Sequence, residues 1–322
     1  MRVAKYQEPR VSLTDSFVAG KVGIVTITYN SRHVLGDFLA SLDRQSYRNF
    51  VLIVVDNASQ DTTLAQLEEH RSEQQIVIAN TVNRGVAEGN NQGIRAAIEA
   101  NCDYILLLNN DVTLDSEMLM HLVDGLSEHK CSMTVPMMYF HTPPNRIWAA
   151  GGRFQSKLGF RADHIGYDEE DSGRSKNAGR IDYAPTCCVL IRREVFAQIG
   201  LMDERFFVYS DDVDFMFRSR QAGIAMFLIP KAKLWHKVNS LTGGINTDFT
   251  YYYTARGRAL FLYKHLSYAS AFIWTSCHTA FDVVRALFRK EFRHPCKVKY
   301  RGMKDGKKVA LQIYPQNHSC PN

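Results

Sequence analysis

The first 130 residues alternate between short apolar runs and segments whose apolar residues recur at helical spacing. The runs have the length of buried strands and lie at 22–28, 51–55, 75–79 and 104–108. The helical segments follow them at 34–45, 61–70, 86–100 and about 116–128. This strand–helix order predicts an α/β fold with a Rossmann-like, doubly wound and mostly parallel sheet.

Beyond residue 130 the pattern is less regular. Extended segments are expected near 132–140 and 181–192, and the polar, glycine-containing stretch 163–180 is expected to be a surface loop. Helical spacing returns at 211–222 and then in two long segments, 249–266 and 268–290. These last two predict a helical C-terminal extension, and the tail from residue 315 is expected to fray.

Polar residues gather where the predicted strands end, which is where doubly wound sheets bind ligands. They are Thr28, Tyr29 and Asn30 after the first strand, Asp56 after the second, Asn83 and Gly85 in the third connection, and Asn109, Asn110 and Asp111 after the fourth. One such carboxylate can accept hydrogen bonds from a base or ribose, and another can hold a divalent cation against a diphosphate. A single Asp at a strand end is commonly a helix cap, but four polar strand ends on one edge favour a shared site.

Three carboxylates, Asp211, Asp212 and Asp214, fall within four positions inside an apolar frame. Like charges this close raise at least one pKa unless a cation compensates, and a carboxylate that stays ionised could deprotonate a hydroxyl group. The alternative is an acidic helix N-terminus, where negative charge is favoured. The spacing alone leaves both interpretations open.

His236 follows Trp235 in a short apolar segment. A histidine in this setting is commonly a packed core residue. A neutral imidazole can also complete a divalent metal site, for which Asp111 is the matching carboxylate.

The net charge of +6 is unevenly distributed. Residues 251–322 hold 13 Lys and Arg against 3 Asp and Glu, whereas residues 1–250 hold 26 against 30. The basic region indicates an anionic partner, either membrane headgroups or a diphosphate-linked lipid, unless it is a solvated basic face. Nucleic acid is not favoured, because no recognition motif is present. The apolar segment 266–284 carries His278 and Asp282, so it is a poor candidate for a membrane span, and an interfacial helix is the alternative that stays open.

The seven cysteines have no zinc-site spacing, and the N-terminus has no apolar signal core. Adjacent Cys187 and Cys188 suit a buried strand better than a pair of metal ligands. We therefore expect reduced thiols and a cytoplasmic protein.

Motifs along the chain resemble those of family 2 glycosyltransferases with the GT-A fold, and within them the bacterial rhamnosyltransferase-like members. The resemblance covers about residues 20–310. The matching segments are Val25 to Asn30, Val54 to Ser59, Asn83 to Gly85, Gly89 to Gly93, Leu108 to Asp111, Gly151-Gly152, Leu190 to Arg193, Phe207 to Asp214, His236, Tyr252 to Arg258 and Arg301 to Gly306.

The resemblance implies roles for individual residues. Asp212 would be the general base with Asp211 as its acidic neighbour, and Asp111 and His236 would hold Mg²⁺ or Mn²⁺. The nucleotide-binding residues would be Thr28, Tyr29, Asn30, Asp56, Asn83, Gly85, Asn90, Asn109 and Asn110. The residues at the acceptor or the phosphates would be Trp235, Tyr253 and Arg256.

Three positions depart from the family pattern. Asn109 stands at the first acidic position of the metal motif, which leaves Asp111 as its main acidic ligand. Asp211 replaces a glutamate, and Gly257 replaces an asparagine in the segment after Tyr252. None of these changes removes the expected base, so an inactive relative is not favoured.

The resemblance implies an inverting, metal-dependent transferase that takes a sugar from a nucleoside-diphosphate donor to a lipid-linked cell-surface glycan, as in lipopolysaccharide O-antigen or polysaccharide biosynthesis. The donor it suggests is dTDP-L-rhamnose, with UDP-hexoses as the alternative. The enzyme would act as a peripheral protein at the inner face of the cell membrane and could form a homodimer. The regions would be an N-terminal extension (1–20), a nucleotide-sugar-binding half (21–130), an acceptor-binding and catalytic half (131–248), and a basic helical region (249–322).

Three other functions make different demands on the sequence. A nucleotidyltransferase would usually carry a glycine-rich basic loop after the first strand, but the loop at 30–33 has no glycine. A dinucleotide oxidoreductase would need G-x-G-x-x-G there, which is absent. A non-catalytic glycan- or membrane-binding protein remains the alternative from another class, and the intact Asp212 argues against it.

Overall fold

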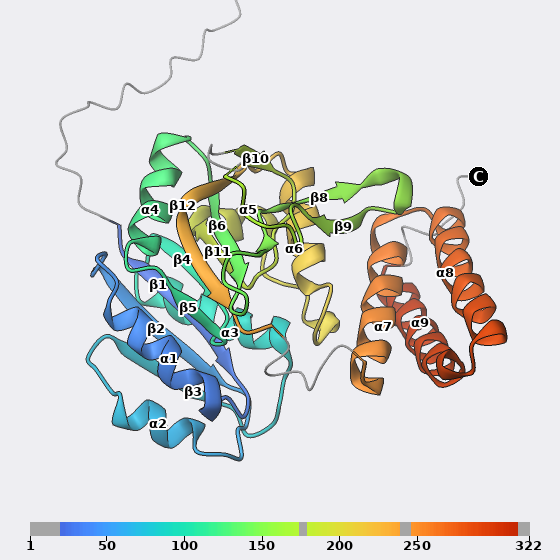
Figure 1. Ribbon diagram of the computed structural model, residues 1–322, viewed down its shortest axis with the longest axis horizontal. Helices are drawn as coiled ribbons and strands as arrows, with labels where there is room; N and C mark the ends of the chain where they lie inside the picture. The colour runs from blue at the N-terminus through green and yellow to red at the C-terminus, as the bar shows by residue number, and fades with distance from the viewer. Residues whose placement is uncertain (1–19, 174–178, 239–245, 315–322) are drawn as a thin grey trace, which may run out of the picture.

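A computed structural model describes residues 20–173, 179–238 and 246–314 (Figure 1). Up to residue 130 its elements are β1 (Val22–Thr28), α1 (Arg32–Asp43), β2 (Phe50–Asp56), α2 (Thr63–Glu69), β3 (Gln75–Ala79), α3 (Val86–Glu99), β4 (Tyr104–Leu108), β5 (Val112–Leu114) and α4 (Met118–Glu128). The predicted order of four strands and four helices is confirmed, with only β5 added.

The second half is built mainly of strands. It contains β6 (Met133–Phe140), β7 (Ile147–Ala149), β8 (Gly152–Gln155), η1 (Ser156–Leu158), β9 (Arg161–His164), β10 (Gly179–Ile181), β11 (Cys188–Arg192), α5 (Arg193–Ile199), η2 (Glu204–Phe206), α6 (Asp211–Gln221) and β12 (Met226–His236). The C-terminal elements are α7 (Asp248–His265), α8 (Tyr268–Phe288), η3 (Lys290–Phe292) and α9 (Arg293–Ile313).

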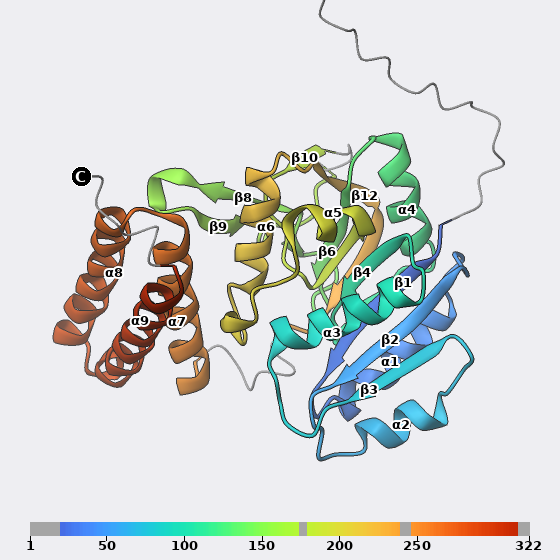
Figure 2. The same cartoon turned by 180° about the vertical axis from the view of Figure 1, so that it is seen from behind.

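One ten-stranded sheet runs through the protein. Its main order is β10-β12-β6-β11-β4-β1-β2-β3, while β5 pairs with β12 and β7 pairs with β6. The strands β3, β2, β1 and β4 are parallel, and β11 is antiparallel to both β4 and β6. Helices α1 and α3 cover opposite faces of the parallel part (Figures 1 and 2). The sheet is therefore doubly wound, as predicted, with a mixed second half.

The parallel strands are buried on both faces, which explains why they read as continuous apolar runs. In β1 every residue except Ile27 is buried, and in β2 every residue after Phe50 is buried. The register pairs Thr28 with Asp56, so these two strands end side by side. The shared polar edge that the sequence predicted is therefore present.

Three predictions for the second half were wrong or incomplete. The stretch 163–180 is not all loop, because β9 extends into its start and β10 begins before its end; residues 174–178 lie outside the described ranges. The short apolar segment around His236 is the end of β12, a strand of 11 residues. A third C-terminal helix, α9, follows the two that were predicted. The expectations for residues 1–19 and for the tail from 315 fall outside the described residues.

Helix α9 packs against α7 at very close range. A Cβ atom added to Gly302 would meet the carbonyl oxygen of Tyr252, and one added to Gly306 would meet that of Arg256. The two glycines are four residues apart and therefore lie on one face of α9. The hydroxyl of Tyr252 donates to Asp305 at 2.8 Å across the same contact. The glycines of the segment Arg301 to Gly306 thus have a packing role.

The C-terminal helices are joined to the sheet domain by buried ion pairs. Asp214 on α6 contacts Lys264 and His265 of α7, both at 2.7 Å. Lys264 also lies 2.7 Å from Asp203, which accepts a hydrogen bond from Tyr314 at the end of α9. Among the described residues, no helix is long and apolar enough to cross a membrane.

Candidate active site

The ends of β1 and β2 are joined by a network around Asp56. Its carboxylate is fully buried and accepts hydrogen bonds from the Thr28 hydroxyl at 2.7 Å and from the Ser59 hydroxyl at 2.5 Å. The backbone N–H of Ser59 donates to it at 2.9 Å. The backbone N–H of Asn30 donates to the Ser59 hydroxyl at 2.8 Å, and the Asn30 side chain accepts from the N–H of Gln60. These contacts fix the loops after both strands in one arrangement.

The third connection is held against the same edge. The Asn83 side chain accepts from the N–H of Gly85 at 2.9 Å, and the Asn57 side chain donates to the Gly85 carbonyl at 2.9 Å. Gly85 has φ +84°, and an added Cβ would clash with the Phe207 carbonyl oxygen, so the position requires glycine. Because Phe207 precedes the acidic segment, this contact brings the nucleotide-binding loops predicted from sequence close to it.

Asp111 and His236 meet at the same edge, although 125 positions separate them. Strand β5 starts directly after Asp111 and pairs antiparallel with the end of β12, so that Val112 faces His236. The His236 Nε2 atom lies 3.2 Å from the Asp111 carboxylate, and both side chains are almost fully buried. The preceding Asn110 is anchored to β1 by a 2.9 Å hydrogen bond to the Ile27 carbonyl. The predicted pair is therefore formed.

The charge on His236 depends on these neighbours. Burial lowers the pKa of the imidazole, while the Cys187 sulfur and the Asp111 carboxylate raise it, with a net result of about 10. Burial raises the pKa of Cys187, which keeps this thiol neutral at pH 7. The Asp111 carboxylate is therefore the group that stabilises a proton on His236, and the imidazole must lose this proton to act as a metal ligand.

A line of aromatic rings connects this pair to Asp212. The Trp148 ring lies edge-on to His236 with centroids 4.4 Å apart, and edge-on to His164 at 4.9 Å. His164 stacks on Tyr183 at 5.9 Å. The Tyr183 hydroxyl then donates to the Asp212 carboxylate at 2.7 Å. The carboxylates of residues 111 and 212 thus face one continuous group of side chains.

Asp211 and Asp212 form a buried acidic pair at the start of α6. Burial raises the pKa of both carboxyl groups, and the charge of Asp212 helps raise that of Asp211 to about 8. The hydrogen bonds from Tyr183 and from the Val213 N–H oppose this effect at Asp212. Because two close carboxylates titrate as a unit, the pair holds one proton near neutral pH. The hydrogen bonds place the charge on Asp212.

The third carboxylate of the acidic segment belongs to a different environment. Asp214 is fully buried but is compensated by Arg218 at 2.9 Å, in addition to Lys264 and His265. Although burial raises its pKa, these cations outweigh the effect and the pKa is lowered. Asp214 therefore stabilises the contact between α6 and α7, whereas the other two carboxylates remain next to Tyr183.

The backbone just before the acidic pair is strained. Tyr209 and Ser210 both adopt left-handed conformations, with φ of 60° and 62°. A Cβ on Gly257 of α7 would lie 2.9 Å from the Ser210 Oγ and from the Tyr209 carbonyl oxygen. Helix α7 therefore holds the strained turn in place, and the departure from the family's asparagine at position 257 removes a side chain for which there is no room. Strain of this kind concentrates at functional sites.

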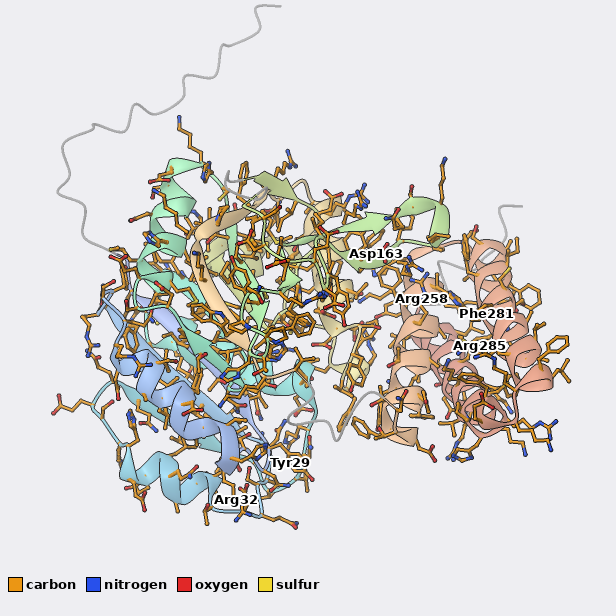
Figure 3. All side chains as sticks on the ribbon, in the orientation of Figure 1. Tyr29, Arg32, Asp163, Arg258, Phe281 and Arg285 are labelled. Atoms are coloured by element: carbon orange, nitrogen blue, oxygen red, sulfur yellow. The ribbon has the colours of Figure 1, made fainter. Side chains whose placement is uncertain are left out.

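The remaining predicted residues fall into two groups. Tyr29 is 45% exposed and Asn109 is exposed, whereas Asn90 is buried on α3 (Figure 3 labels Tyr29 beyond the end of β1). Trp235 faces away from its neighbour His236 in the strand, and its ring nitrogen donates to the Pro144 carbonyl at 3.1 Å.

Two residues predicted at the acceptor or the phosphates are engaged elsewhere. Tyr253 stacks on Phe207 with centroids 5.1 Å apart. The Arg256 guanidinium donates to the Arg205 carbonyl at 2.7 Å. Both side chains therefore join α7 to the segment before α6.

The residues that sequence reasoning missed are Trp148, His164 and Tyr183. They lie on β7, on β9 and in the loop before β11, and none belongs to a motif with a chemical signature. Burial lowers the pKa of His164, which keeps its ring neutral beside Asp212. Only their three-dimensional packing shows that they line the path between the acidic pair and His236.

The Asp111–His236 pair has the ligand types of a divalent metal site. In the described ranges, no three His, Cys, Asp or Glu side chains are arranged to hold a metal ion by themselves. Mg²⁺-type ions are usually held by one or two protein ligands together with substrate phosphates. One carboxylate and one imidazole at the ligand-binding edge fit that second arrangement, and the buried Nδ1 atom of His236 has no hydrogen-bond partner among the described residues. The pair therefore fits a cation that arrives with a diphosphate.

Comparisons with known proteins agree with this geometry. The chain is 29% identical over 174 residues to the low-salt glycan biosynthesis hexosyltransferase Agl10 of Haloferax volcanii, a match that covers 53% of this chain and 54% of the relative. It is 24% identical to an N-acetylglucosaminyl-diphospho-decaprenol L-rhamnosyltransferase of Mycobacterium tuberculosis, with 68% of this chain and 77% of the relative covered. The chain thus spans about half the length of the first relative and about three quarters of the second.

The fold has clear counterparts among solved structures. The structure of GalNAc-T7 with UDP, GalNAc and Mn²⁺ superposes with a TM-score of 0.63 at 13% identity, covering 94% of this chain and 58% of that one. This likeness establishes the GT-A fold. The model of glycosyl transferase family 2 matches residues 23–200, which span the strand ends, the Asp111 motif and β11. The chain belongs to glycosyl transferase family 2.

Proposed function

We propose that the protein is an inverting, metal-dependent glycosyltransferase with Asp212 as its catalytic base. The observation that carries this proposal is the placement of Asp212. Its carboxyl group is oriented by Tyr183 and lies on a path of side chains that leads to the Asp111–His236 pair. A single displacement requires this arrangement, because the base lies on one side of the site and the edge that binds the diphosphate lies on the other.

The reaction follows from these positions. Asp212 accepts the proton of an acceptor hydroxyl. At the same time the oxygen of that hydroxyl forms a bond to the anomeric carbon. The bond from that carbon to the nucleoside diphosphate breaks from the opposite side, so the configuration inverts through a transition state with oxocarbenium character. A divalent cation held by Asp111 and His236 would stabilise the charge gained by the leaving group. Asp211 keeps its proton and thereby limits the repulsion at the base.

The donor side is assigned to the edge formed by β1, β2 and β4. Asp56 and its partners would orient the base and ribose, and the exposed Tyr29 would contact the base. The hydrogen bonds of Thr28, Asn83 and Asn110 fix the loops that surround it. We propose dTDP-L-rhamnose as the donor because the motifs resemble rhamnosyltransferases and one relative carries that activity in its name. A UDP-hexose is the alternative, favoured by the similarity to a hexosyltransferase.

We propose that the acceptor is a lipid-linked glycan and that the enzyme contacts a membrane through α8. Seven large apolar side chains of this helix are between 43% and 85% exposed. They are Phe272, Ile273, Phe281, Val283, Val284, Leu287 and Phe288. The exposed cations Arg289, Lys290 and Arg293 follow directly, so the face combines apolar area with positive charge, as membrane-surface helices do.

The experiment that tests the proposed function compares Asp212→Asn with the wild-type protein and with Asp248→Asn, an exposed Asp on α7. Sugar transfer is measured from dTDP-L-rhamnose and from UDP-hexoses to a synthetic lipid-diphosphate acceptor, with and without Mn²⁺. Because general-base catalysis contributes about 10²–10⁴-fold, Asp212→Asn should lose turnover by that factor while donor binding persists. Near-normal turnover of Asp212→Asn, or no transfer by the wild-type protein from any donor, would reject the proposal.

A further inference from the structure

A cavity of about 470 Å³ lies beside the acidic pair, between the sheet domain and the C-terminal helices. It is bounded by β9, by the start of α6 and by α7, α8 and α9. Its polar lining includes Arg161, Tyr183, Arg258, His278, Asp282 and Lys299. Figure 3 labels Arg258 and Asp163 where the β8–β9 hairpin approaches α7. None of the nucleotide-binding or metal-binding residues proposed above lines this cavity.

The cavity adjoins the base directly. Tyr183, whose hydroxyl donates to Asp212 at 2.7 Å, forms part of its wall. Ser210 and Val213, which flank the acidic pair in the chain, form another part. A ligand in the cavity would therefore place its neighbouring groups beside Asp212.

The cations of the cavity are incompletely compensated. Arg161 is paired with Asp163 at 2.8 Å, and Lys299 is paired with Asp282 at 2.9 Å. Arg258 has no carboxylate within ion-pair distance in the described parts of the chain; one of its Nη atoms donates to the Leu158 carbonyl at 2.9 Å.

The Arg258 Nε atom is buried and has no hydrogen-bond partner among the described residues. Burial and the nearby charge of Arg161 lower the pKa of the Arg258 guanidinium to about 10, so the positive charge is held at a cost. The buried Nε2 atom of His278 also has no partner in the described ranges, and burial and the charge of Arg258 lower the pKa of this imidazole, which favours its neutral form. A positively charged group with unused donors in a cavity is the arrangement that binds phosphate oxygens.

The surroundings of the cavity suit an anion that carries a lipid. His278 and Asp282 line it from α8, whose outer face carries the exposed apolar side chains described above. Phe281, labelled in Figure 3 together with Arg285, is 62% exposed and lies next in sequence to Asp282. A chain leaving the cavity along α8 would therefore reach an apolar surface.

We propose that this cavity binds the diphosphate of the lipid-linked acceptor, with Arg258 as the main ligand and Lys299 and His278 as secondary ones. The inference rests on the proposed function, and it adds the means by which the acceptor is recognised. The diphosphate fixes the reducing end of the glycan, so that a hydroxyl of the sugar attached to it reaches Asp212. Recognition of the acceptor is thereby separated from recognition of the donor, which uses the opposite edge.

The test measures binding of farnesyl diphosphate to the full-length protein by titration calorimetry in EDTA, which prevents metal-dependent binding at the donor edge. The variants are Arg258→Gln and Lys299→Gln, with Lys304→Gln, an exposed cation of α9 outside the cavity, as the matched control. Inorganic diphosphate and farnesol serve as probes of the charged and apolar parts. Melting temperatures confirm that each variant is folded.

Farnesyl diphosphate should bind the wild-type protein and Lys304→Gln equally. Its dissociation constant should rise about tenfold or more in Arg258→Gln, because a charge-assisted hydrogen bond to phosphate is lost. Lys299→Gln should act in the same direction, since it also leaves Asp282 uncompensated beside the anion. Inorganic diphosphate should bind more weakly and with the same dependence on Arg258, which identifies the charged group rather than the lipid as the ligand of that residue.

Equal binding of farnesyl diphosphate by all folded variants, or equal binding of farnesol and farnesyl diphosphate by the wild-type protein, would overturn the inference. Such a result would leave the proposed function intact if the protein still transferred sugar in an Asp212-dependent reaction. Conversely, Arg258-dependent binding of diphosphate without any sugar transfer would support the cavity as an anion site and reject the proposed reaction. The two proposals can therefore fail separately.

Discussion

Asp211 and Asp212 are adjacent and chemically identical, yet their hydrogen bonds separate them. Asp212 receives the Tyr183 hydroxyl and the Val213 N–H, both of which stabilise its ionised form. Burial and the charge of Asp212 raise the pKa of Asp211 to about 8. The sequence showed that a carboxylate cluster was present, and the resemblance to the family motif implied that Asp212 acts as the base. It could not show that Tyr183, 29 residues away, orients it.

The role of Tyr183 leads to a prediction about pH. The Tyr183 hydroxyl lowers the pKa of Asp212, so Tyr183→Phe should raise that pKa. Because the base works only when ionised, the acid limb of kcat/KM should move to higher pH, and activity at fixed neutral pH should fall. Tyr139→Phe is the control, because it removes a comparable 2.7 Å hydrogen bond to Asp171 and should leave the acid limb of kcat/KM at the same pH. The measurement is the initial rate as a function of pH. An acid limb that stays at the wild-type pH in Tyr183→Phe would contradict the role assigned to Tyr183.

Among the secondary-structure elements, the strands of the parallel half of the sheet could be predicted from the sequence. Strands buried on both faces give continuous apolar runs, and β1, β3 and β4 begin and end where they were expected. The second half was harder because β5, β7 and β8 have only three or four residues, too few to show a period. Helix α9 was missed because small and charged residues cover much of it, and its contact with α7 depends on glycines rather than on apolar side chains.

Helix packing through glycine makes a second prediction. Gly306→Ala places a Cβ against the Arg256 carbonyl oxygen, so α9 must move away from α7. Overpacking of this kind costs about 1–3 kcal/mol of unfolding free energy. Gly36→Ala is the matched control, because a Cβ at this exposed position of α1 meets no atom within 4 Å. It should stabilise the protein by about 0.5–1 kcal/mol through the better helix propensity of alanine. Urea denaturation of both variants would contradict the packing model if Gly306→Ala were as stable as the wild-type protein.

For the molecule as a whole, two regions with different tasks are held together by charge. Asp203 and Asp214 of the sheet domain share Lys264 of α7, and α7 in turn supports the strained turn before the acidic pair. The uneven charge of the sequence predicted a basic C-terminal region, and the described part of that region is helical. It did not show that these helices would also form a wall of the cavity beside the base.

The exposed face of α8 makes a third prediction, about membrane binding. Replacing Leu287 and Phe288 by Ser removes two of its most exposed apolar side chains, at 70% and 85%. Binding to vesicles that contain anionic phospholipid should fall sharply in sedimentation, because buried apolar area and charge act together at such surfaces. The control pair, Val82→Ser with Leu64→Ser, alters exposed apolar residues far from α8 in the sequence and should bind as the wild-type protein does. Unaltered sedimentation of the α8 variant would show that another surface, or a second copy of the chain on α8, accounts for this face.

The central claim is that Asp111 and His236 hold a divalent cation against the donor diphosphate at the edge of the sheet that faces Asp212. Anomalous diffraction from a crystal grown with Mn²⁺ and a nucleoside diphosphate tests it most directly. The account predicts one manganese peak about 2 Å from the Asp111 carboxylate and from His236, bridged to the diphosphate, and absent in Asp111→Ala. A nucleotide bound elsewhere, or a manganese peak that persists in Asp111→Ala, would contradict it.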